Sequence, residues 1–458
     1  MIHVAMALRI GAPRYAGPMT GITRRSALAA LAGGVLLRGQ APANADVAII
    51  GAGSAGLNAA RRLRELGRTV VVLEARNRIG GRAWTESDTF GIPFDRGCAW
   101  LHKADDNPYT PLAREWGFTL FEHNNHLDGL WLGDRRATDA ERKRQADEES
   151  RLDEVMMKRG KQGKDKSGEA WLKRRGTVED AVATFHGPMS SAVDLDELST
   201  VDYLTIGTDV EPNLLIKEGY GTLVARYGSE VAVELNTPVR TVRYSGQGVE
   251  LETAKGTVRA KACVVTSSTG VLAAEKIRFD PVLPEWKRDA IADIPMGLLA
   301  KIPLQFRESG LFGLKDFDDL LREQRGKRDI YFLSFPFHLP LMVGFVGGDF
   351  AWELSAAGER EAVDYAMHHL RHMLGSDVDK QLVKGSFTQW AGDPWALGAY
   401  ATATPGNGRS REALRRTVAE RVYFAGEACA SRWTQTCGGA AISGRETAEA
   451  VHKALGAA

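Results

Sequence analysis

The chain has 458 residues, which predicts two or three domains, and its 44% hydrophobic and 26% charged residues are typical of a globular protein with a sizeable core. The 59 basic and 58 acidic residues leave a net charge of +1, so no strong field favours nucleic acid or an anionic membrane. Four scattered cysteines are too few for a disulfide scaffold, and the absence of a C-x-x-C pair argues against a structural zinc site. The 49 glycines, without a collagen-like period, predict tight turns and phosphate-binding loops.

The first predicted feature is an export signal. Arg24-Arg25 precede an apolar stretch, Ala27–Leu37, and a small-residue A-x-A site. This order resembles a twin-arginine signal peptide over residues 1–45, which predicts the twin-arginine (Tat) export machinery as a partner and the periplasm as the destination. The apolar stretch is about half of the roughly 20 residues that span a bilayer, so we expect no stable membrane anchor. A disordered tail with a chance Arg pair, and a start at Met19 in place of Met1, stay open as alternatives.

A nucleotide-binding β–α–β unit is expected directly after this segment. Val47–Ile50 is an apolar run typical of a buried parallel strand, and a helix over Leu57–Leu66 and a strand over Thr69–Leu73 follow it. The G-x-G-x-x-G pattern after the first strand supplies a tight turn, close backbone approach to a pyrophosphate, and close helix–strand packing. The residues expected to hold the dinucleotide are Gly51, Gly53, Ser54, Ala55, Gly56 and, for a ribose hydroxyl, Glu74.

The sequence that follows resembles one family of flavoproteins. Glu74–Arg82 resembles the E-A-R-x-R-x-G-G-R stretch of the FAD-dependent amine oxidase family, which includes monoamine and polyamine oxidases, and Phe94–His102 resembles its D-x-G-x-x-W segment. Near the C-terminus, Arg421–Glu427 predicts a strand ending in Gly-Glu, and Cys437–Gly444 opens an alanine-rich helix that reaches about Leu455, as in the family's last module. The resemblance implies FAD as the cofactor.

The resemblance also implies a fold. The expected class is mixed α/β, with a Rossmann-like FAD-binding domain of the amine oxidase/glutathione-reductase type interleaved with a substrate-binding domain. The FAD-binding domain is expected over residues 46–100, 212–272 and 385–458, and the substrate-binding domain over residues 101–211 and 273–384. The family's further cofactor contacts map onto Ala75, Arg76, Gly81, Arg82, Gly97, Cys98, Ala99, Trp100, Val239, Trp390, Gly426, Glu427, Cys437, Gly439 and Ala440.

Three residues are assigned to the chemistry. Lys301 lies in an apolar strand, and from the residues alone an edge-strand lysine that reaches solvent is the favoured interpretation. The resemblance reverses this, because the family's G-x-x-x-K position, here Lys301, holds a lysine bridged by water to flavin N5. Tyr400 matches one wall of the family's aromatic cage, and the second cage tyrosine maps onto Thr436. Ala399 stands where monoamine oxidases carry a flavin-linking cysteine, which implies non-covalent FAD.

The implied activity is oxidation of a primary or secondary amine, a polyamine or an alkaloid-type amine, to an imine that hydrolyses to an aldehyde or ketone plus amine or ammonia. The electrons pass to O2 or to a periplasmic electron carrier. An L-amino-acid oxidase, which needs an arginine for the carboxylate, and a non-catalytic flavin-binding partner protein stay open as alternatives. We expect no metal site, since His368 and His372 have no third ligand, and no nucleic-acid surface, since stretch 134–175 carries both charge signs. A homodimer is left open.

Overall fold

The computed structural model describes residues 44–456, apart from 125–128, 174–175, 209 and 325–326. The expected signal peptide lies outside these residues except for its last two, Asn44 and Ala45, which already belong to the first strand. Among the residues described, no helix is long and apolar enough to cross a membrane.

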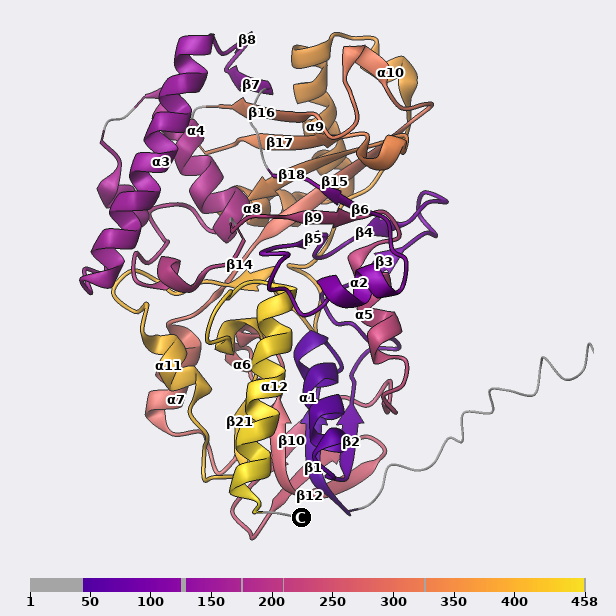
Figure 1. The fold of residues 1–458 in the computed structure, drawn as a ribbon, viewed down its shortest axis with the longest axis vertical. Coiled ribbons are helices and arrows are strands. Elements are labelled where there is room, and N and C mark those ends of the chain that lie inside the picture. The colour runs from indigo at the N-terminus through magenta and orange to yellow at the C-terminus, as the bar shows by residue number, and fades with distance from the viewer. Residues whose placement is uncertain (1–43, 125–128, 174–175, 209, 325–326, 457–458) are drawn as a thin grey trace, which may run out of the picture. The chain divides into compact units, whose positions relative to one another are not determined.

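A seven-stranded sheet carries the predicted nucleotide-binding unit, in the order β13-β10-β11-β12-β1-β2, with β21 also paired to β12 (Figure 1). Strands β2, β1, β12 and β21 run parallel, and Ile50 at the end of β1 lies between Leu73 and Val265. Their carboxyl ends therefore share one edge, the edge at which open parallel sheets bind ligands. The strands are β1 (Asn44–Ile50), β2 (Val70–Leu73), β10 (Val239–Arg243), β11 (Val249–Thr253), β12 (Gly256–Val265), β13 (Arg278–Asp280) and β21 (Val422–Phe424).

The two faces of this sheet are buried in different cores. Val47 and Ile49 of β1 pack with helices on one face, whereas Ala48 and Ile50 pack with helices on the other, as the two-residue period of a strand requires. The helices of the first core are α1 (Ser54–Glu65), α5 (Tyr220–Gly228) and α12 (Cys437–Ala454), and those of the second are α6 (Thr269–Ala273), α7 (Glu285–Ala292) and α11 (Ser410–Arg415).

Helices α1 and α12 lie side by side although they come from opposite ends of the chain (Figure 1). Gly444 permits their close approach, because a Cβ at this position would lie 2.1 Å from the carbonyl oxygen of Ala55. Ser54 Oγ donates to the carbonyl oxygen of Cys437 at 2.9 Å, which joins the first turns of the two helices. The N-termini of both helices therefore open at the same place.

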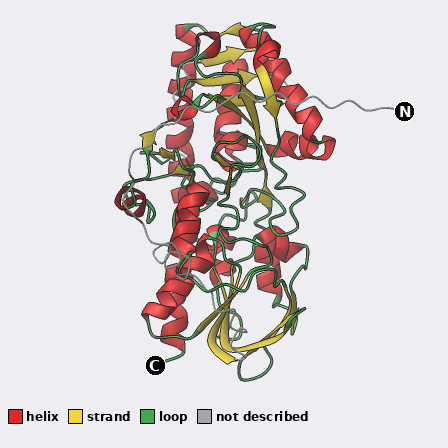
Figure 2. Ribbon diagram, turned by 90° about the vertical axis from the view of Figure 1, so that its right-hand side faces the viewer, coloured by secondary structure: helices red, strands yellow, loops and turns green. Residues whose placement is uncertain are grey.

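A second seven-stranded sheet has the order β19-β15-β18-β17-β16-β7-β8, and Figure 2 shows it as a separate layer from the first. In its antiparallel part Lys301 lies opposite Phe345, and Phe345 lies opposite Tyr331, so the three side chains share one face of the sheet. The strands are β7 (Gly129–Leu132), β8 (Arg135–Arg136), β15 (Leu299–Phe306), β16 (Asp319–Glu323), β17 (Ile330–Ser334), β18 (Leu341–Gly347) and β19 (Leu382–Gly385).

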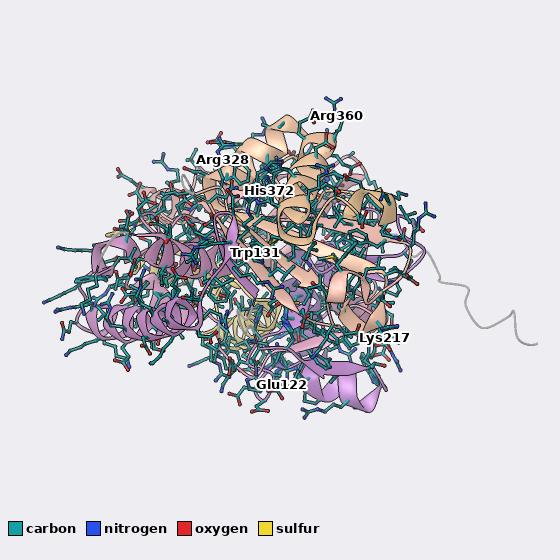
Figure 3. All side chains as sticks on the ribbon, turned by 90° about the horizontal axis from the view of Figure 1, so that it is seen from above. Glu122, Trp131, Lys217, Arg328, Arg360 and His372 are labelled. Carbon is teal, nitrogen blue, oxygen red and sulfur yellow. The ribbon has the colours of Figure 1, made fainter. Side chains whose placement is uncertain are left out.

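Helices cover the second sheet, and short strands lie between the two sheets. Seen from above, Arg360 on α9 extends outward from the surface (Figure 3). These helices are α3 (Asp139–Lys161), α4 (Thr177–Thr184), α8 (Gly348–Ala357) and α9 (Glu359–Leu374). The short strands form the sets β3 (Thr85–Glu86) with β4 (Phe94–Asp95), β5 (Trp100–Leu101) with β9 (Leu214–Ile216) and β6 (Leu120–Glu122), and β14 (Met296–Gly297) with β20 (Tyr400–Ala401).

The mixed α/β class is confirmed. At two places, however, the boundary between the FAD-binding and the substrate-binding domain differs from the expected one. Strand β13 pairs with β10 in the first sheet, so residues 278–280 do not belong with the substrate-binding segment 273–384. Trp390 packs in the core of the second sheet, although it lies in the segment 385–458 assigned to the FAD-binding domain. Both differences arise from contacts between elements far apart in sequence.

Candidate active site

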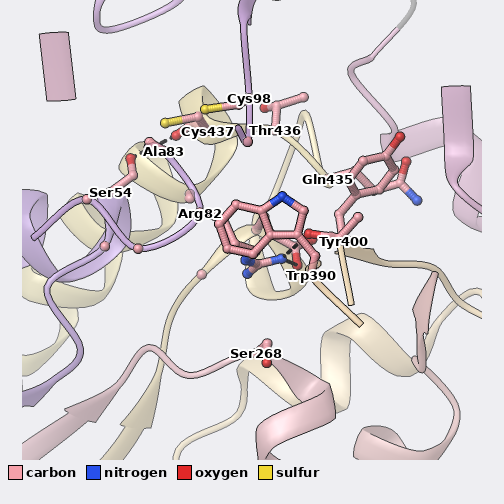
Figure 4. A pocket seen from close by; sticks show the side chains of 18 of the residues that line it. Ser54, Arg82, Ala83, Cys98, Ser268, Trp390, Tyr400, Gln435, Thr436 and Cys437 are labelled. Carbon is pink, nitrogen blue, oxygen red and sulfur yellow. Dashed lines mark hydrogen bonds and ion pairs between the residues drawn. The ribbon is translucent and has the colours of Figure 1, made fainter. Parts of the chain in front are cut away.

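A cavity of about 290 Å³ begins at the carboxyl edge of the first sheet and reaches the Lys301 face of the second (Figure 4). Every residue expected to bind the cofactor or take part in the chemistry lines it, except Gly56 and Gly439. A Cβ at Gly56 would lie 1.9 Å from the carbonyl oxygen of Gly51, and one at Gly439 would lie 1.9 Å from that of Trp433. Gly56 therefore serves the helix–strand packing that its motif predicts. Gly439 serves packing of α12 and does not itself line the cavity.

One end of the cavity is built from backbone groups. Gly51 has φ +104°, and a Cβ there would lie 2.5 Å from Thr266 Oγ1, so this turn requires glycine. The N-terminus of α1 has no side-chain cap, so its first-turn N–H groups and its positive dipole end are available to a phosphate. Glu74, which is buried, accepts hydrogen bonds from Ala52 N at 2.7 Å and from Arg76 N at 2.8 Å. These residues fit the diphosphate and ribose of a dinucleotide such as FAD.

Three arginines line the cavity, and each is paired with a carboxylate. The pairs are Arg76–Asp393 at 2.6 Å, Arg82–Glu427 at 2.9 Å and Arg96–Glu86 at 3.1 Å. Arg82 also donates to the carbonyl oxygen of Ala399 at 2.7 Å. The expected cofactor residues Arg76, Arg82 and Glu427 are thus brought to the cavity with their charges already compensated by the protein. Among the described lining residues, no arginine is unpaired and available to bind a substrate carboxylate.

Lys301 is a buried lysine on the cavity wall, with only 7% of its surface exposed. The backbone of Lys301 is paired with Phe345 of β18 on one side and hydrogen-bonded to Thr388 on the other, so the interpretation as an edge-strand lysine that reaches solvent is wrong. Its Nζ donates to the carbonyl oxygens of Asp95 at 2.7 Å and of Gly97 at 2.6 Å. Burial lowers the pKa of Lys301 to about 8, although the charge of Asp95 opposes this shift. The amine can therefore gain or lose a proton close to neutral pH.

Trp390, Tyr400 and Thr436 line the wall of the cavity (Figure 4). Trp390 Nε1 donates to the carbonyl oxygen of Arg96 at 2.8 Å, and the Tyr400 hydroxyl donates to that of Ser190 at 3.3 Å. Thr436 is the N-cap of α12, because its Oγ1 accepts a hydrogen bond from Gly439 N at 2.9 Å. Its hydroxyl is thus used to hold the helix N-terminus that opens into the cavity.

Several residues of the cavity were not predicted. Tyr331 and Phe345 form its wall beside Lys301, and their cross-strand pairing supplies the only signal that links them to it. His102 Nδ1 donates a hydrogen bond to Asn213 Oδ1 at 2.9 Å, and burial lowers the pKa of His102 to about 4. His102 is therefore neutral at pH 7. His102 is the last residue of the stretch Phe94–His102, and no pattern in the sequence marks it as part of the site.

The structure contains no metal cluster within the residues it describes: no group of three or more His, Cys, Asp or Glu side chains lies close enough together to hold an ion. His368 and His372 have ring centroids 4.6 Å apart on α9, and His372 lies at the outer surface (Figure 3).

The chain belongs to the family described as flavin containing amine oxidoreductase, whose model matches residues 54–452. The cofactor is accordingly FAD, and the protein is an FAD-dependent amine oxidoreductase. A shorter match, to the alanine dehydrogenase/PNT C-terminal domain over residues 25–82, overlaps the predicted β–α–β unit.

Characterised relatives extend over most of the chain. Polyamine oxidase 4 of Oryza sativa subsp. japonica is 29% identical over 92% of this chain and 92% of its own length. Human lysine-specific histone demethylase 2 is 27% identical over 88% of this chain, which spans only 52% of that protein. Two solved structures share the fold. Putrescine oxidase bound to putrescine has a TM-score of 0.75 at 23% identity, covering 89% of this chain and 98% of that one. Cyclohexylamine oxidase from Brevibacterium oxydans IH-35A has a TM-score of 0.75 at 22% identity, covering 90% and 99%.

Proposed function

We propose that the protein oxidises a primary or secondary amine to an imine, which hydrolyses to an aldehyde or ketone plus amine or ammonia. Polyamines and alkaloid-type amines are the substrate classes to test first, and O2 or a periplasmic carrier receives the electrons. The observation that carries the proposal is the buried Lys301 amine, held by two carbonyl groups on the wall of a cavity that also contains the dinucleotide motif. Bound FAD supplies the electron-accepting chemistry.

Different residues of the chain would bind different parts of FAD. The N-terminus of α1 and the turn at Gly51 would hold the diphosphate, and Glu74 would hold the ribose. Val239, which lines the cavity, would contact the adenine part. Ala399 carries no sulfur to link the flavin, which supports non-covalent binding.

Lys301 and the aromatic side chains of the cavity would favour the neutral form of the substrate amine and exclude water from it. A primary or secondary amine must be neutral to release electrons from its α-carbon, and apolar surroundings disfavour its charged form. Trp390, Tyr400, Tyr331 and Phe345 line the cavity and exclude water from it. With a pKa of about 8, Lys301 would orient a water molecule and exchange a proton with it without leaving its two carbonyl partners.

Two findings support an amine over an amino acid as substrate. The three arginines of the cavity wall are each paired with a protein carboxylate, so those described offer no partner for a substrate carboxylate. Polyamine oxidase 4, putrescine oxidase and cyclohexylamine oxidase all carry names of amine oxidases. We therefore rank the L-amino-acid oxidase below the amine enzyme.

Export by the twin-arginine pathway is part of the proposal. The residues that line the cavity come from both ends of the chain, so FAD can bind only after the chain has folded. The twin-arginine pathway exports folded proteins, which would allow FAD to bind in the cytoplasm before export. A reporter fused behind residues 1–45 should reach the periplasm, and Arg24→Lys together with Arg25→Lys should abolish its export. A reporter that stays in the cytoplasm in both forms would contradict the assignment.

The proposed reaction is tested by a substrate panel with product analysis. The FAD-loaded enzyme is incubated with diamines and polyamines, cyclic and aryl-substituted amines, and L-amino acids, with O2 uptake and reduction of an artificial dye measured in parallel. We expect an aldehyde or ketone from at least one amine and none from the amino acids, and the two electron assays show which acceptor is used. Turnover of amino acids alone would replace the proposal by the amino-acid oxidase.

A further inference from the structure

Two cysteines far apart in sequence meet in the wall of the active-site cavity. Cys98 lies between β4 and β5, Cys437 is the first residue of α12, and both are free thiols that line the cavity (Figure 4). Figure 4 shows the two thiol groups beside each other, and each of them shifts the pKa of the other. The other two cysteines, Cys263 and Cys429, are buried in a different core and do not line this cavity. No step of the proposed reaction uses either of the thiols that meet.

The surroundings make the two thiols unequal. Cys437 stands at the N-terminus of an 18-residue helix, where the dipole favours a thiolate. The neighbouring thiol of Cys98 lowers the pKa of Cys437, and the hydroxyls of Ser54 and Tyr220 and the charge of Arg82 act in the same direction. The thiol of Cys437 and burial raise the pKa of Cys98. Cys437 is therefore the nucleophile of the pair, and Cys98 is the thiol that keeps its proton.

We propose that Cys98 and Cys437 form a reversible oxidation site, at which hydrogen peroxide converts the two thiols into a disulfide. The Cys437 sulfur attacks one peroxide oxygen, so an S–O bond forms, the O–O bond breaks, and one water leaves after taking up a proton. The Cys98 sulfur then attacks the Cys437 sulfur, so the S–S bond forms, the S–O bond breaks, and a second water leaves. The two thiols lose two electrons and two protons, and the peroxide is reduced to two waters.

Formation of the disulfide would change the hydrogen bonding of Lys301. An S–S bond of about 2.05 Å is shorter than any contact between non-bonded sulfur atoms, so its formation draws the Cys98 segment towards the N-terminus of α12. Lys301 Nζ holds the carbonyl oxygens of Asp95 and Gly97, directly before Cys98 in the chain. Oxidation would therefore displace the partners of the Lys301 amine. This consequence for turnover rests on the proposed function, whereas formation of the disulfide does not.

The test counts thiols in the FAD-loaded enzyme. Reduced enzyme is treated with hydrogen peroxide without amine, denatured, and titrated with a thiol reagent. We expect the four thiols to fall to two, a peptide map to show Cys98 joined to Cys437, and dithiothreitol to restore all four. Cys98→Ser should instead leave a sulfenic acid at Cys437, which a cyclic dione traps. The matched control Cys263→Ala should form the same disulfide as the unmodified chain. The absorbance of bound FAD checks that each variant is folded.

The outcomes separate this inference from the proposed function. Persistence of all four thiols, or oxidation that maps to Cys263 or Cys429, would overturn the thiol pair even if an amine reduces the enzyme. Loss of two thiols in an enzyme that no amine reduces would uphold the pair and overturn the proposed function. Where both hold, the oxidised form should oxidise amine at a rate that differs at least several-fold from the reduced form, and dithiothreitol should reverse the difference.

Discussion

Replacing Lys301 by methionine tests the role of the buried amine while keeping an unbranched side chain. The change removes the hydrogen bonds to the carbonyl oxygens of Asp95 and Gly97, and each buried acceptor left without a partner costs about 1–3 kcal/mol. It also removes the cost of burying a charged amine. A fall of the pKa from 10.5 to about 8 corresponds to about 3 kcal/mol at roughly 1.4 kcal/mol per unit. The two terms oppose each other, so Lys301→Met should lower the free energy of unfolding by at most about 3 kcal/mol and stay folded.

The effect on catalysis should be larger than the effect on stability. We expect amine-driven reduction or reoxidation of the bound FAD to slow about 10²-fold, the usual range for loss of an acid–base group. In the unmodified enzyme this rate should change with a pKa near 8, and Lys301→Met should lack that dependence. Stopped-flow spectra between about pH 6 and 10 measure both properties. Unchanged rates with an unchanged pH profile would refute the role.

The pH dependence of stability provides a second readout with a definite sign. The folded pKa lies below the unfolded one, so the folded chain binds fewer protons between pH 8 and 10.5, and unfolding becomes less favourable as the pH rises through this window. Urea denaturation of the unmodified chain should show this gain, and Lys301→Met should show a smaller one, because Lys287, whose pKa burial lowers to about 7, still contributes over the same window. Lys287→Met is the matched control, because Lys287 is also fully buried, donates to three backbone carbonyl oxygens and does not line the cavity. It should lose stability and keep the rates and their pH profile.

Three further changes test other parts of the structure. Arg411→Ala should lower the free energy of unfolding by about 3–5 kcal/mol, because it leaves the buried carboxylate of Asp202 without its partner. The control Arg360→Ala, at the surface, should leave the free energy of unfolding nearly unchanged, and denaturant titration compares the two. Thr436→Ala should cost about 1 kcal/mol through loss of the α12 cap, and Thr436→Ser should restore most of it, measured as thermal unfolding. Glu74→Ala should weaken FAD binding at least tenfold, followed by FAD release on dilution; retention of FAD equal to the unmodified chain would contradict the site.

The sequence predicted those elements whose signals are local. The G-x-G-x-x-G turn with its helix and strands, and helix α12, are each specified by periodicity, small residues and neighbours within a few turns. Strand β13 was assigned to the wrong part, because nothing in residues 278–280 reveals that they pair with β10. Tyr331 and Phe345 were missed for the same reason, since only strand register brings them beside Lys301. The meeting of Cys98 with Cys437 depends on α12 packing against α1, which no local pattern encodes.

Lys301 shows most clearly what the sequence alone cannot predict. Hydrophobic surroundings in the sequence fit both a buried lysine and an edge lysine that reaches solvent, and the two differ only in whether β15 has a neighbour on each side. The family resemblance favours a lysine at the active site, and the structure shows Lys301 buried on the cavity wall. Thr436 shows the reverse case, because its position in the cavity was expected, whereas its use as the cap of α12 emerged only from the backbone geometry.

The central claim, that this chain oxidises amines with FAD, is tested most directly by anaerobic titration of the FAD-loaded enzyme. Polyamines, cyclic amines and aryl-substituted amines are added one by one without oxygen, and the visible absorbance band of oxidised FAD is followed. We expect at least one amine to abolish this band, with formation of an aldehyde or ketone in proportion, and L-amino acids to leave it unchanged. If dithionite reduces the bound FAD and no amine does, the protein does not oxidise amines.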